Sequence, residues 1–180
     1  MNTKAIKWNT LAIILASLLF YCCQPEEKKQ ILIYDGPLRE MEDVDMLYTE
    51  KDHLKVKMVA KKIFEYQNRD SEFPEGIYLE FYDEFGKISS TLQANSAYYF
   101  KEEDKWRGRG NVIVKNIAKS QQLNTEELFW TRTTKKISTE KFVTIRDAED
   151  VIYGTGLDAD QDLSNYKITN VTGIINVEEN

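Results

Sequence analysis

The stretch GRGNVIVKNIAKSQQLNTEELFWTRTTKKISTEKFVTI, residues 108–145, decides the fold class of this chain. Apolar and polar residues alternate along its short runs, which is the period of two that half-buried β-strands show. The residue types agree, because β-branched and aromatic side chains such as those of residues 112–114 and 143–145 favour a pleated surface. We predict that this stretch forms successive antiparallel strands of one sheet.

An internal repeat runs through this stretch and continues upstream of it. The segments LNTEELFW (123–130) and ISTEKFVT (137–144) share an apolar residue, a Thr-Glu pair two places on, and a second apolar residue five places on. LQANSAYY (92–99) and MVAKKIFE (58–65) carry similar apolar positions around a small Ala. The copies are unevenly spaced, so we expect a sheet built from similar hairpins and not a regular solenoid.

Further strands are expected on both sides of the central stretch. Residues 43–66 predict a hairpin that turns at Lys51-Asp52-His53, and residues 77–100 predict another that turns at Asp83–Gly86. Strands at this spacing indicate an all-β sandwich, roll or barrel, and no long amphipathic helix follows the N-terminal segment. The other expected features are a polar loop at residues 68–76, a charged loop at 101–110, a turn at Gly154–Gly156 and a last strand at Tyr166–Val177.

Length and composition indicate one globular domain. A chain of 180 residues with 42% apolar residues can bury a core, which excludes a disordered protein. The 10 Tyr, 8 Phe and 3 Trp suit a fold whose broad side chains cover a sheet face. The sequence leaves two alternatives open: the apolar positions fill an ordinary sandwich core, or they line a sheet interior that holds a hydrophobic ligand.

The first 23 residues differ from the rest of the chain. Lys4 and Lys7 precede an apolar run from Leu11 to Tyr21, and polar residues follow abruptly, as in a secretion signal. The run is shorter than the roughly 20 residues that a spanning helix needs, although neighbouring apolar residues leave a retained helix as the alternative. We expect a signal and anchor segment at residues 1–23, a tether at 24–30 and the β domain at 31–180.

The two cysteines of the chain, Cys22 and Cys23, both stand at the end of the apolar run. A disulfide between adjacent residues would be strained and would staple nothing. Their position resembles the lipobox of bacterial lipoproteins, in which the cysteine after the apolar run is acylated. Cys23 is the better candidate for a lipid anchor because the small Cys22 precedes it, and Cys22 is the alternative; Phe20 and Tyr21 depart from the usual pattern. Several acyl chains would hold a domain firmly to a membrane.

The charge of the chain argues against nucleic-acid binding. Removal of the signal would take Lys4 and Lys7 from the 24 basic residues and none of the 30 acidic residues, which changes the net charge from −6 to −8. Nucleic-acid binding is driven by clustered Lys and Arg. Short basic clusters occur at Lys61-Lys62, at residues 105–109 and at residues 132–136. They form solvated faces that protect sheet edges, or they contact a phosphorylated head group.

The sequence offers no set of catalytic or metal-binding residues. His53 is the only histidine, so the residues needed for a histidine-based catalytic triad or zinc site are missing. Asp158, Asp160 and Asp162 have calcium-like spacing, but Leu163 stands where such a loop needs Gly and Thr169 where it needs Glu. No glycine-rich phosphate loop opens a helix, and no feature selects a pair of catalytic carboxylates. We therefore predict a binding module without a cofactor or metal, and not an enzyme.

The order of motifs resembles the LptC family of lipopolysaccharide-export proteins. The resemblance covers residues 43–175 and is most specific in GRGNVIV with LNTEELFW, and in the GTGLDAD to VTGII ending. The other segments that carry it are DVDMLYTEKDHLKVKMVAKKI, LQANSAYYF and ISTEKFVTI. The resemblance implies an open β-jellyroll on the periplasmic side of the bacterial inner membrane. One departure is that many members use a spanning helix, whereas this chain resembles an acylated protein.

The resemblance also implies partners and a lipid-binding groove. Family members receive lipopolysaccharide from an ABC transporter of the inner membrane and pass it to a periplasmic bridge of similar jellyrolls, with the acyl chains in the hydrophobic interior. The last strand, residues 166–177, is the edge expected to pair with the next jellyroll. The alternatives are a non-catalytic lipoprotein that scaffolds an envelope complex, and a related bridge or outer-membrane assembly component. By alternation, the expected groove residues are Leu79, Phe81, Leu92, Val112, Val114, Leu123, Leu128, Trp130, Ile137 and Phe142.

Overall fold

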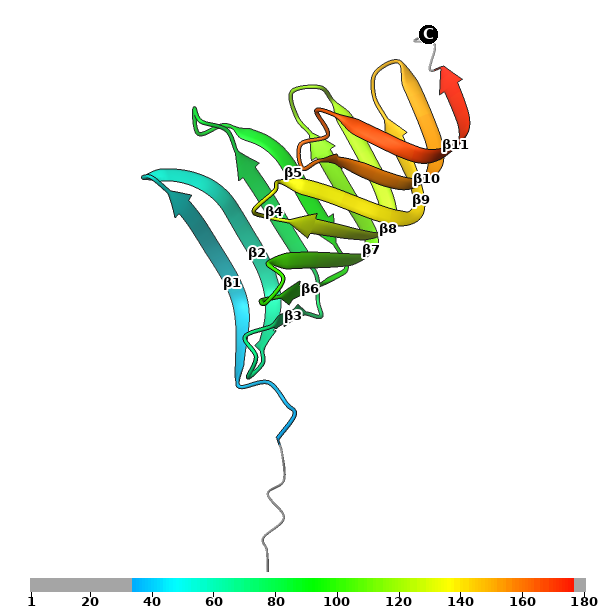
Figure 1. Ribbon diagram of the computed structural model, residues 1–180. Coiled ribbons are helices and arrows are strands. Elements are labelled where there is room, and N and C mark those ends of the chain that lie inside the picture. Colours follow the sequence, from blue (N-terminus) through cyan, green and yellow to red (C-terminus); the bar gives the residue numbers. More distant parts are fainter. Residues whose placement is uncertain (1–33, 177–180) are drawn as a thin grey trace, which may run out of the picture. The chain divides into compact units, whose positions relative to one another are not determined.

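The computed structural model describes residues 34–176, so the expected signal, anchor cysteines and tether lie outside the described residues. The described chain is all β, without a helix, and its strands belong to one compact unit, Asp35–Asn180 (Figure 1). The strands are β1 (Arg39–Glu50), β2 (His53–Glu65), β3 (Ser71–Phe73), β4 (Ile77–Tyr82), β5 (Ile88–Ala94), β6 (Ser96–Phe100), β7 (Lys105–Asn116), β8 (Gln121–Thr131), β9 (Lys136–Arg146), β10 (Asp150–Asp160) and β11 (Tyr166–Asn176).

All the strands pair antiparallel within a single sheet. The sheet runs from β11 through β10, β9 and β8 to β7, and then divides. One branch continues through β5 and β4 to β2, the other through β6 and β3 to β2, and β1 pairs with β2 beyond them. The expected fold class is therefore confirmed: the chain is all β, with one large antiparallel sheet consistent with a β-jellyroll.

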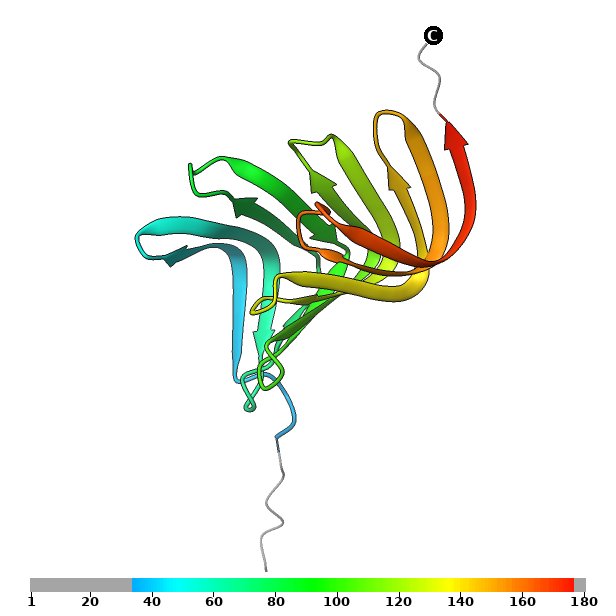
Figure 2. The same ribbon diagram turned by 45° about the horizontal axis from the view of Figure 1, so that its top comes forward.

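The sheet folds into two facing layers because its long strands bend along one line. The register shifts between Arg109 and Val112 where β7 pairs with β8, and between Thr125 and Phe129 where β8 pairs with β9. A further shift lies in β10 between Thr155 and Leu157. The bend is visible in Figure 2. We call the half that contains β4 and β5 the β4–β5 layer, and the half that contains β3 and β6 the β3–β6 layer.

Glycines permit the bend at the points where a side chain would be strained. Gly110 and Gly156 have φ angles of 72° and 79°, a region that L-residues rarely adopt. A Cβ at Gly156 would also lie 2.8 Å from Thr169 Oγ1. The turn expected at Gly154–Gly156 is wrong, because both glycines lie inside β10. A glycine within a strand pattern marks a bulge as readily as a turn, and here it marks a bulge.

The two expected hairpins are confirmed, whereas two expected loops contain strands. Lys51 and Asp52 have positive φ angles and turn β1 into β2, and the backbone of Asp83 bonds with Gly86 and Lys87 in the β4–β5 turn. However, β3 lies within the expected loop at residues 68–76, and β7 begins at Lys105 within the expected loop at 101–110. Charged residues fit these strands because their side chains lie on the outer face of the sheet.

Candidate functional site

A continuous row of apolar side chains crosses the inner face of the β4–β5 layer. Each residue of this row stands directly opposite the next one on a neighbouring strand, so all of them share one face. In order from β1 to β11, the row consists of Met46, Met58, Leu79, Leu92, Val114, Leu123, Ile145, Ile152 and Ile174. We call it the apolar ladder. It joins one free edge of the sheet to the other.

The apolar ladder is exposed at its two ends and closed between them. Met46 on β1 is 47% exposed and Ile174 on β11 is 59% exposed, whereas the residues from Met58 to Ile145 are buried. Large apolar side chains on the inner face at both edges leave hydrophobic surface that the protein does not cover. The ladder therefore offers apolar contact where a ligand could arrive and where it could leave.

The β3–β6 layer faces the ladder with a second row, rich in aromatic rings. Tyr99, Trp106 and Trp130 stand opposite one another on β6, β7 and β8, and the rings of Trp106 lie 4.6 Å from Tyr99 and 5.9 Å from Trp130. The Trp130 ring also meets the Phe81 ring of the opposite layer edge-on, at 5.2 Å between centroids. The two layers thus pack into one hydrophobic core.

A cavity of about 170 Å³ remains between the layers on the β1–β2 side. Met46, Tyr48 and Val56 line it from the β4–β5 layer, and Tyr99, Trp106 and Trp130 line it from the other. Arg132, in the turn after β8, is the only charged residue in the lining. Its guanidinium lies 5.3 Å from the centre of the Tyr48 ring, a cation–π contact that spans the open side of the two layers.

The β10–β11 loop closes the opposite half of the interior. Leu163 at the centre of this loop is fully buried in the hydrophobic core. Two hydrogen bonds tie the loop to the β7–β8 end of the opposite layer: Asn116 Nδ2 donates to Asp162 O at 2.6 Å, and Lys119 Nζ donates to Ser164 O at 3.0 Å. The interior is therefore hollow beside β1 and β2 and filled beside β10 and β11.

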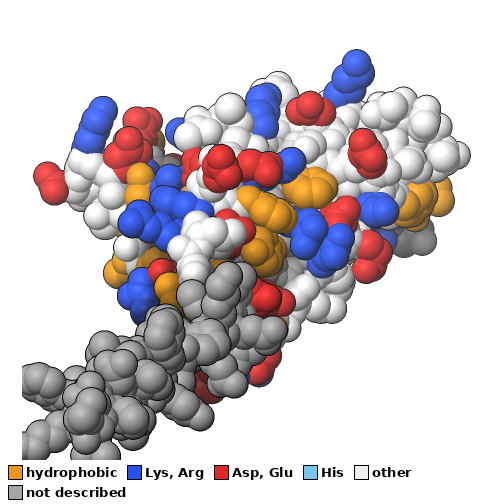
Figure 3. Space-filling view, turned by 60° about the horizontal axis from the view of Figure 1, so that its bottom comes forward, with side chains coloured by type: hydrophobic (Ala, Val, Ile, Leu, Met, Phe, Trp, Pro, Cys, Tyr) orange, Lys and Arg blue, Asp and Glu red, His pale blue; other side chains and the backbone are white. Residues whose placement is uncertain are grey.

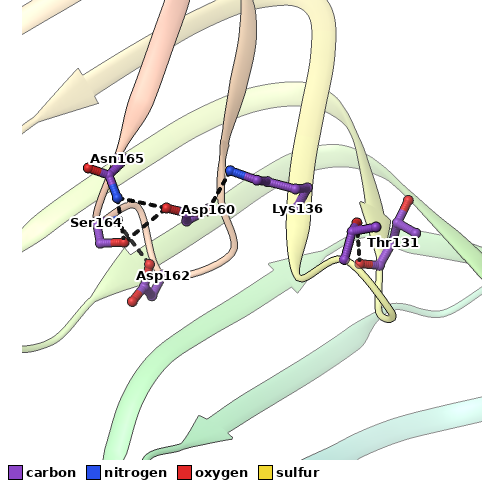
Figure 4. Close-up of polar contacts among 7 residues, drawn as sticks. Thr131, Lys136, Asp160, Asp162, Ser164 and Asn165 are labelled. Carbon is purple, nitrogen blue, oxygen red and sulfur yellow. Dashed lines mark hydrogen bonds and ion pairs between the residues drawn. The ribbon is translucent and has the colours of Figure 1, made fainter.

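The acidic residues of this loop form a structural network (Figure 4). Asp160 accepts bonds from Asn165 Nδ2 at 2.9 Å and Ser164 Oγ at 3.2 Å and pairs with Lys136 at 2.6 Å. The Lys136 ammonium and the two hydrogen-bond donors lower the pKa of Asp160 to about 2. Within residues 34–176, no three His, Cys, Asp or Glu side chains are placed to hold a metal ion together.

The sequence of the chain also matches a known protein family. The family described as "Lipopolysaccharide-assembly, LptC-related" matches residues 10–176, which is nearly the whole chain. The chain belongs to the LptC family. LptC membership implies a role in lipopolysaccharide transport, and the family is an inner-membrane-associated component of the periplasmic envelope. No curated protein matches the chain. In the described part of the chain, no helix has the length and apolar character to span a membrane.

Nine of the ten residues expected to line an LptC-type groove lie on the inner face. They are buried in the hydrophobic core: Leu79, Phe81, Leu92, Val112, Val114, Leu123, Leu128, Trp130 and Ile137. The inward orientation expected for Phe142 is wrong, because this side chain is 54% exposed and stacks with Tyr153 on the outer face. Whether the nine buried residues contact lipid stays a prediction.

The error at Phe142 comes from unequal bulges in the two repeats. In β8 the inner face changes from Thr125 to Leu128, a spacing of three that an extra residue produces. In β9 the inner positions keep one parity from Thr139 to Val143, so Val143 and not Phe142 takes the inner position. The sequence repeat aligned Phe142 with Leu128, but only β8 changes the parity of its inner positions, and alternation from Ile137 alone places Phe142 on the outer face.

Four members of the LptC-type interior were missing from the expected groove. Met46, Met58, Tyr99 and Trp106 line the cavity or the ladder. Met46 and Met58 each stand in an alternating apolar run of the hairpin at residues 43–66, so this signal could have found them. No signal in the sequence separates Trp106 from a residue of a charged loop, because its neighbours are Lys105 and Arg107.

The outer face of the β3–β6 layer combines aromatic rings with cations. Arg107 lies over the rings of Tyr98 and Phe100 at 5.9 and 5.3 Å, and Lys105 lies over Phe129 at 4.4 Å. Figure 3 shows a face on which hydrophobic side chains border Lys and Arg side chains. These contacts cover the rings with cations, so the basic cluster at residues 105–109 has a structural use.

Proposed function

We propose that this chain accepts lipopolysaccharide from an ABC transporter of the inner membrane and passes it to a periplasmic bridge protein. The acylated Cys23, or Cys22, or else a retained N-terminal helix, anchors it to the periplasmic side of that membrane. The apolar ladder is the observation that carries the proposal, because it joins the two sheet edges and is exposed at both. The acyl chains lie along the ladder and the sugars stay outside.

The physical chemistry of this transfer requires binding and no bond breaking. Each buried methylene of an acyl chain contributes about 0.8 kcal/mol, so several chains favour the interior strongly over water. The energy for extraction from the membrane comes from the transporter. The free edges of β1 and β11 offer backbone groups for strand addition, because β1 pairs only with β2 and β11 only with β10 in the described sheet. The bridge protein pairs with β11.

Photocrosslinking at the two ends of the ladder tests this proposal. Met46 and Ile174 face inward, while their neighbours Leu47 and Ile175 are similarly exposed but face outward, which makes them matched controls. A photoreactive residue at 46 or 174 is expected to capture lipopolysaccharide in cells, in a manner that depends on ATP. The same residue at 47 or 175 is expected to capture none. Equal capture at inner and outer positions would contradict transport along the inner face.

A second candidate function is favoured by the burial of the apolar ladder between its two ends. A lipoprotein that only scaffolds an envelope complex through its sheet edges would also bury the residues from Met58 to Ile145. The same experiment separates the two functions. If position 46 and position 174 both capture proteins but no lipid, in a folded and membrane-bound protein, the scaffold function is correct.

A further inference from the structure

We propose that Arg132 forms a subsite for the phosphate of a lipid whose acyl chain occupies the apolar cavity. This inference rests on the proposed function and makes it more specific, since it assigns the head group of the ligand as well as its tail. The first observation is the position of Arg132: every other residue that lines the cavity is apolar or aromatic, and this one cation stands where the cavity opens.

The second observation is a polar cleft that continues from the apolar cavity. This cleft, of about 660 Å³, shares Tyr48, Val56, Trp130 and Arg132 with the cavity. The two spaces therefore meet at Arg132, with apolar walls on one side and charged walls on the other. A site that changes from apolar to polar across one arginine matches an amphiphile with an anionic head.

The charges of the polar cleft include two cations without a partner of their own. Lys55 and Lys135 line it, and neither forms an ion pair with a described residue. Glu50, Asp83 and Glu84 also line it. Asp83 is engaged in its own turn, where Oδ1 accepts the backbone N–H groups of Phe85 and Lys87 at 2.9 Å. Lys55 and Lys135 add two positive charges to that of Arg132, so the three cations of the lining balance its three carboxylates.

The surroundings of Arg132 hold its guanidinium in place and leave donors available. One nitrogen, Nη2, lies 3.3 Å from Asp104 Oδ1, and the side chain is still 42% exposed. Tyr99 donates to the same oxygen at 3.0 Å, and burial, together with this bond, raises the pKa of Tyr99, which keeps it a neutral donor. A guanidinium has five N–H donors, so its remaining donors can bind two phosphate oxygens at once.

The test measures lipid binding to the full chain in nanodiscs through tryptophan fluorescence. Trp106 and Trp130 line the cavity, so an acyl chain that enters it changes their emission. The probes are lipid A with its phosphates, the same lipid A after dephosphorylation, and inorganic phosphate. The variants are Arg132→Gln, Arg132→Lys and, as a matched control, Arg146→Gln, which removes an exposed arginine near the other end of β9.

We expect the unmodified chain to bind phosphorylated lipid A at least tenfold more tightly than the dephosphorylated lipid. Arg132→Gln should weaken binding of the phosphorylated lipid about tenfold to a hundredfold and leave the dephosphorylated lipid unchanged, because hydrogen bonds to charged groups are strong. Arg132→Lys should keep part of the preference for the phosphorylated lipid, since lysine keeps the positive charge but lacks the planar guanidinium that donates two parallel hydrogen bonds. Arg146→Gln should behave as the unmodified chain.

Three other outcomes would overturn the subsite. If Arg132→Gln keeps its circular dichroism spectrum and still prefers phosphorylated lipid A, the phosphate binds elsewhere while the proposed transport function stands. If inorganic phosphate competes at the same concentration as the lipid, Arg132 is a site for free phosphate and not for a lipid head. If the unmodified chain binds neither lipid, the proposed function itself fails.

Discussion

Leu123 shows how a buried residue differs from a residue that a ligand can reach. Its side chain is fully buried at the centre of the apolar ladder, opposite Val114 and Ile145. A charged substitution such as Leu123→Asp would bury an unpaired carboxylate, which costs so much that it tests folding and not lipid transfer. For groove residues of this kind, lipid contact requires the surrounding layers to move first.

The first prediction is that Leu123→Ala destabilises the domain by about 2–5 kcal/mol, through lost burial and the cavity that it leaves. Urea unfolding of the full chain measures the change in the free energy of unfolding. Leu47→Ala is the matched control, because Leu47 is 61% exposed on the outer face and should change stability by less than about 0.5 kcal/mol. An equal decrease in the free energy of unfolding of the two variants would show that the packing of Leu123 in the ladder does not stabilise the domain.

The second prediction concerns Asp160 and acid stability. The pKa of Asp160 is about 2 in the folded chain, below its ordinary value of 3.8. A carboxyl whose pKa is lowered by folding stabilises the fold above the unfolded pKa, and this contribution is lost as the pH falls toward 2. Asp160→Asn should therefore lower the melting temperature at pH 6, and its difference from the parent chain should vanish between about pH 4 and 2. A constant difference across that range would show that Asp160 acts through shape alone.

Residue by residue, the sequence predicted the inner face well wherever a strand alternates without interruption. Leu79 and Phe81 alternate along β4, and Val112 and Val114 along β7, and all four are inward. It failed at Phe142, because the repeat with Leu128 suggested an inward side chain there, whereas the alternation from Ile137 makes Phe142 outward. The sequence also could not predict how exposed each inward side chain is. Alternation gives the face on which a residue lies, but not how far the opposite layer covers it.

Among the elements, β11 depends on the glycines of β10. A Cβ at Gly154 would clash with Ile168 Cγ2 and lie 2.6 Å from the backbone oxygen of Asn170, so the two strands can approach only because no side chain is there. Gly173 lies in the same hairpin, yet a Cβ there would meet only Tyr153 Cδ2, at 3.8 Å. The close approach at Gly154 holds β11 at the free edge of the sheet.

The third prediction is that Gly154→Ala destabilises the domain by about 1–3 kcal/mol and loosens β11, because the added methyl group overpacks a closed contact. Hydrogen exchange should show faster exchange of the β11 amides, and binding of the bridge protein to this edge should weaken. Gly173→Ala should change neither quantity noticeably. If Gly154→Ala leaves β11 protected, the strand is held by its other contacts and not by the close approach.

The elements that sequence predicted best are hairpins with a marked turn. The β1–β2 and β4–β5 hairpins have alternating strands and a polar turn, and both form as expected. Charged strands were missed, since β3 and the start of β7 carry Glu72, Lys105 and Arg107 on the outer face. A charged run with alternating inward residues is compatible with a strand, and only pairing with a partner strand distinguishes it from a loop.

For the whole molecule, the sequence identified the architecture but not the state of the interior. The motif order gave the family and with it the jellyroll, which the family match over residues 10–176 confirms. The apolar ladder could not be foreseen, because it depends on the register of strands that are distant in the sequence. The interior is filled on one side because the β10–β11 loop buries Leu163 there. The sequence does not predict this burial, because Leu163 is a single apolar residue within an acidic segment.

The last prediction follows from this difference between the two halves. A lipid that moves from Met46 to Ile174 has to pass the place where the β10–β11 loop joins the layers, through Asn116 with Asp162 and Lys119 with Ser164. A thiol-to-thiol crosslink between Lys119→Cys and Ser164→Cys would fix that junction. The lipid adduct at position 46 should then persist, while the adduct at position 174 disappears.

Two comparisons decide whether the junction itself matters. The single variant Lys119→Cys, treated with the same reagent, should keep both adducts, because it carries only one introduced thiol; Cys22 and Cys23, the only cysteines of the unaltered chain, precede the described residues. Reduction of a cleavable crosslink should restore the adduct at 174. If the adduct at 174 survives the crosslink, lipid reaches the β11 edge without opening this side of the interior. The lipid would then contact Ile174 from outside and would not have moved along the ladder.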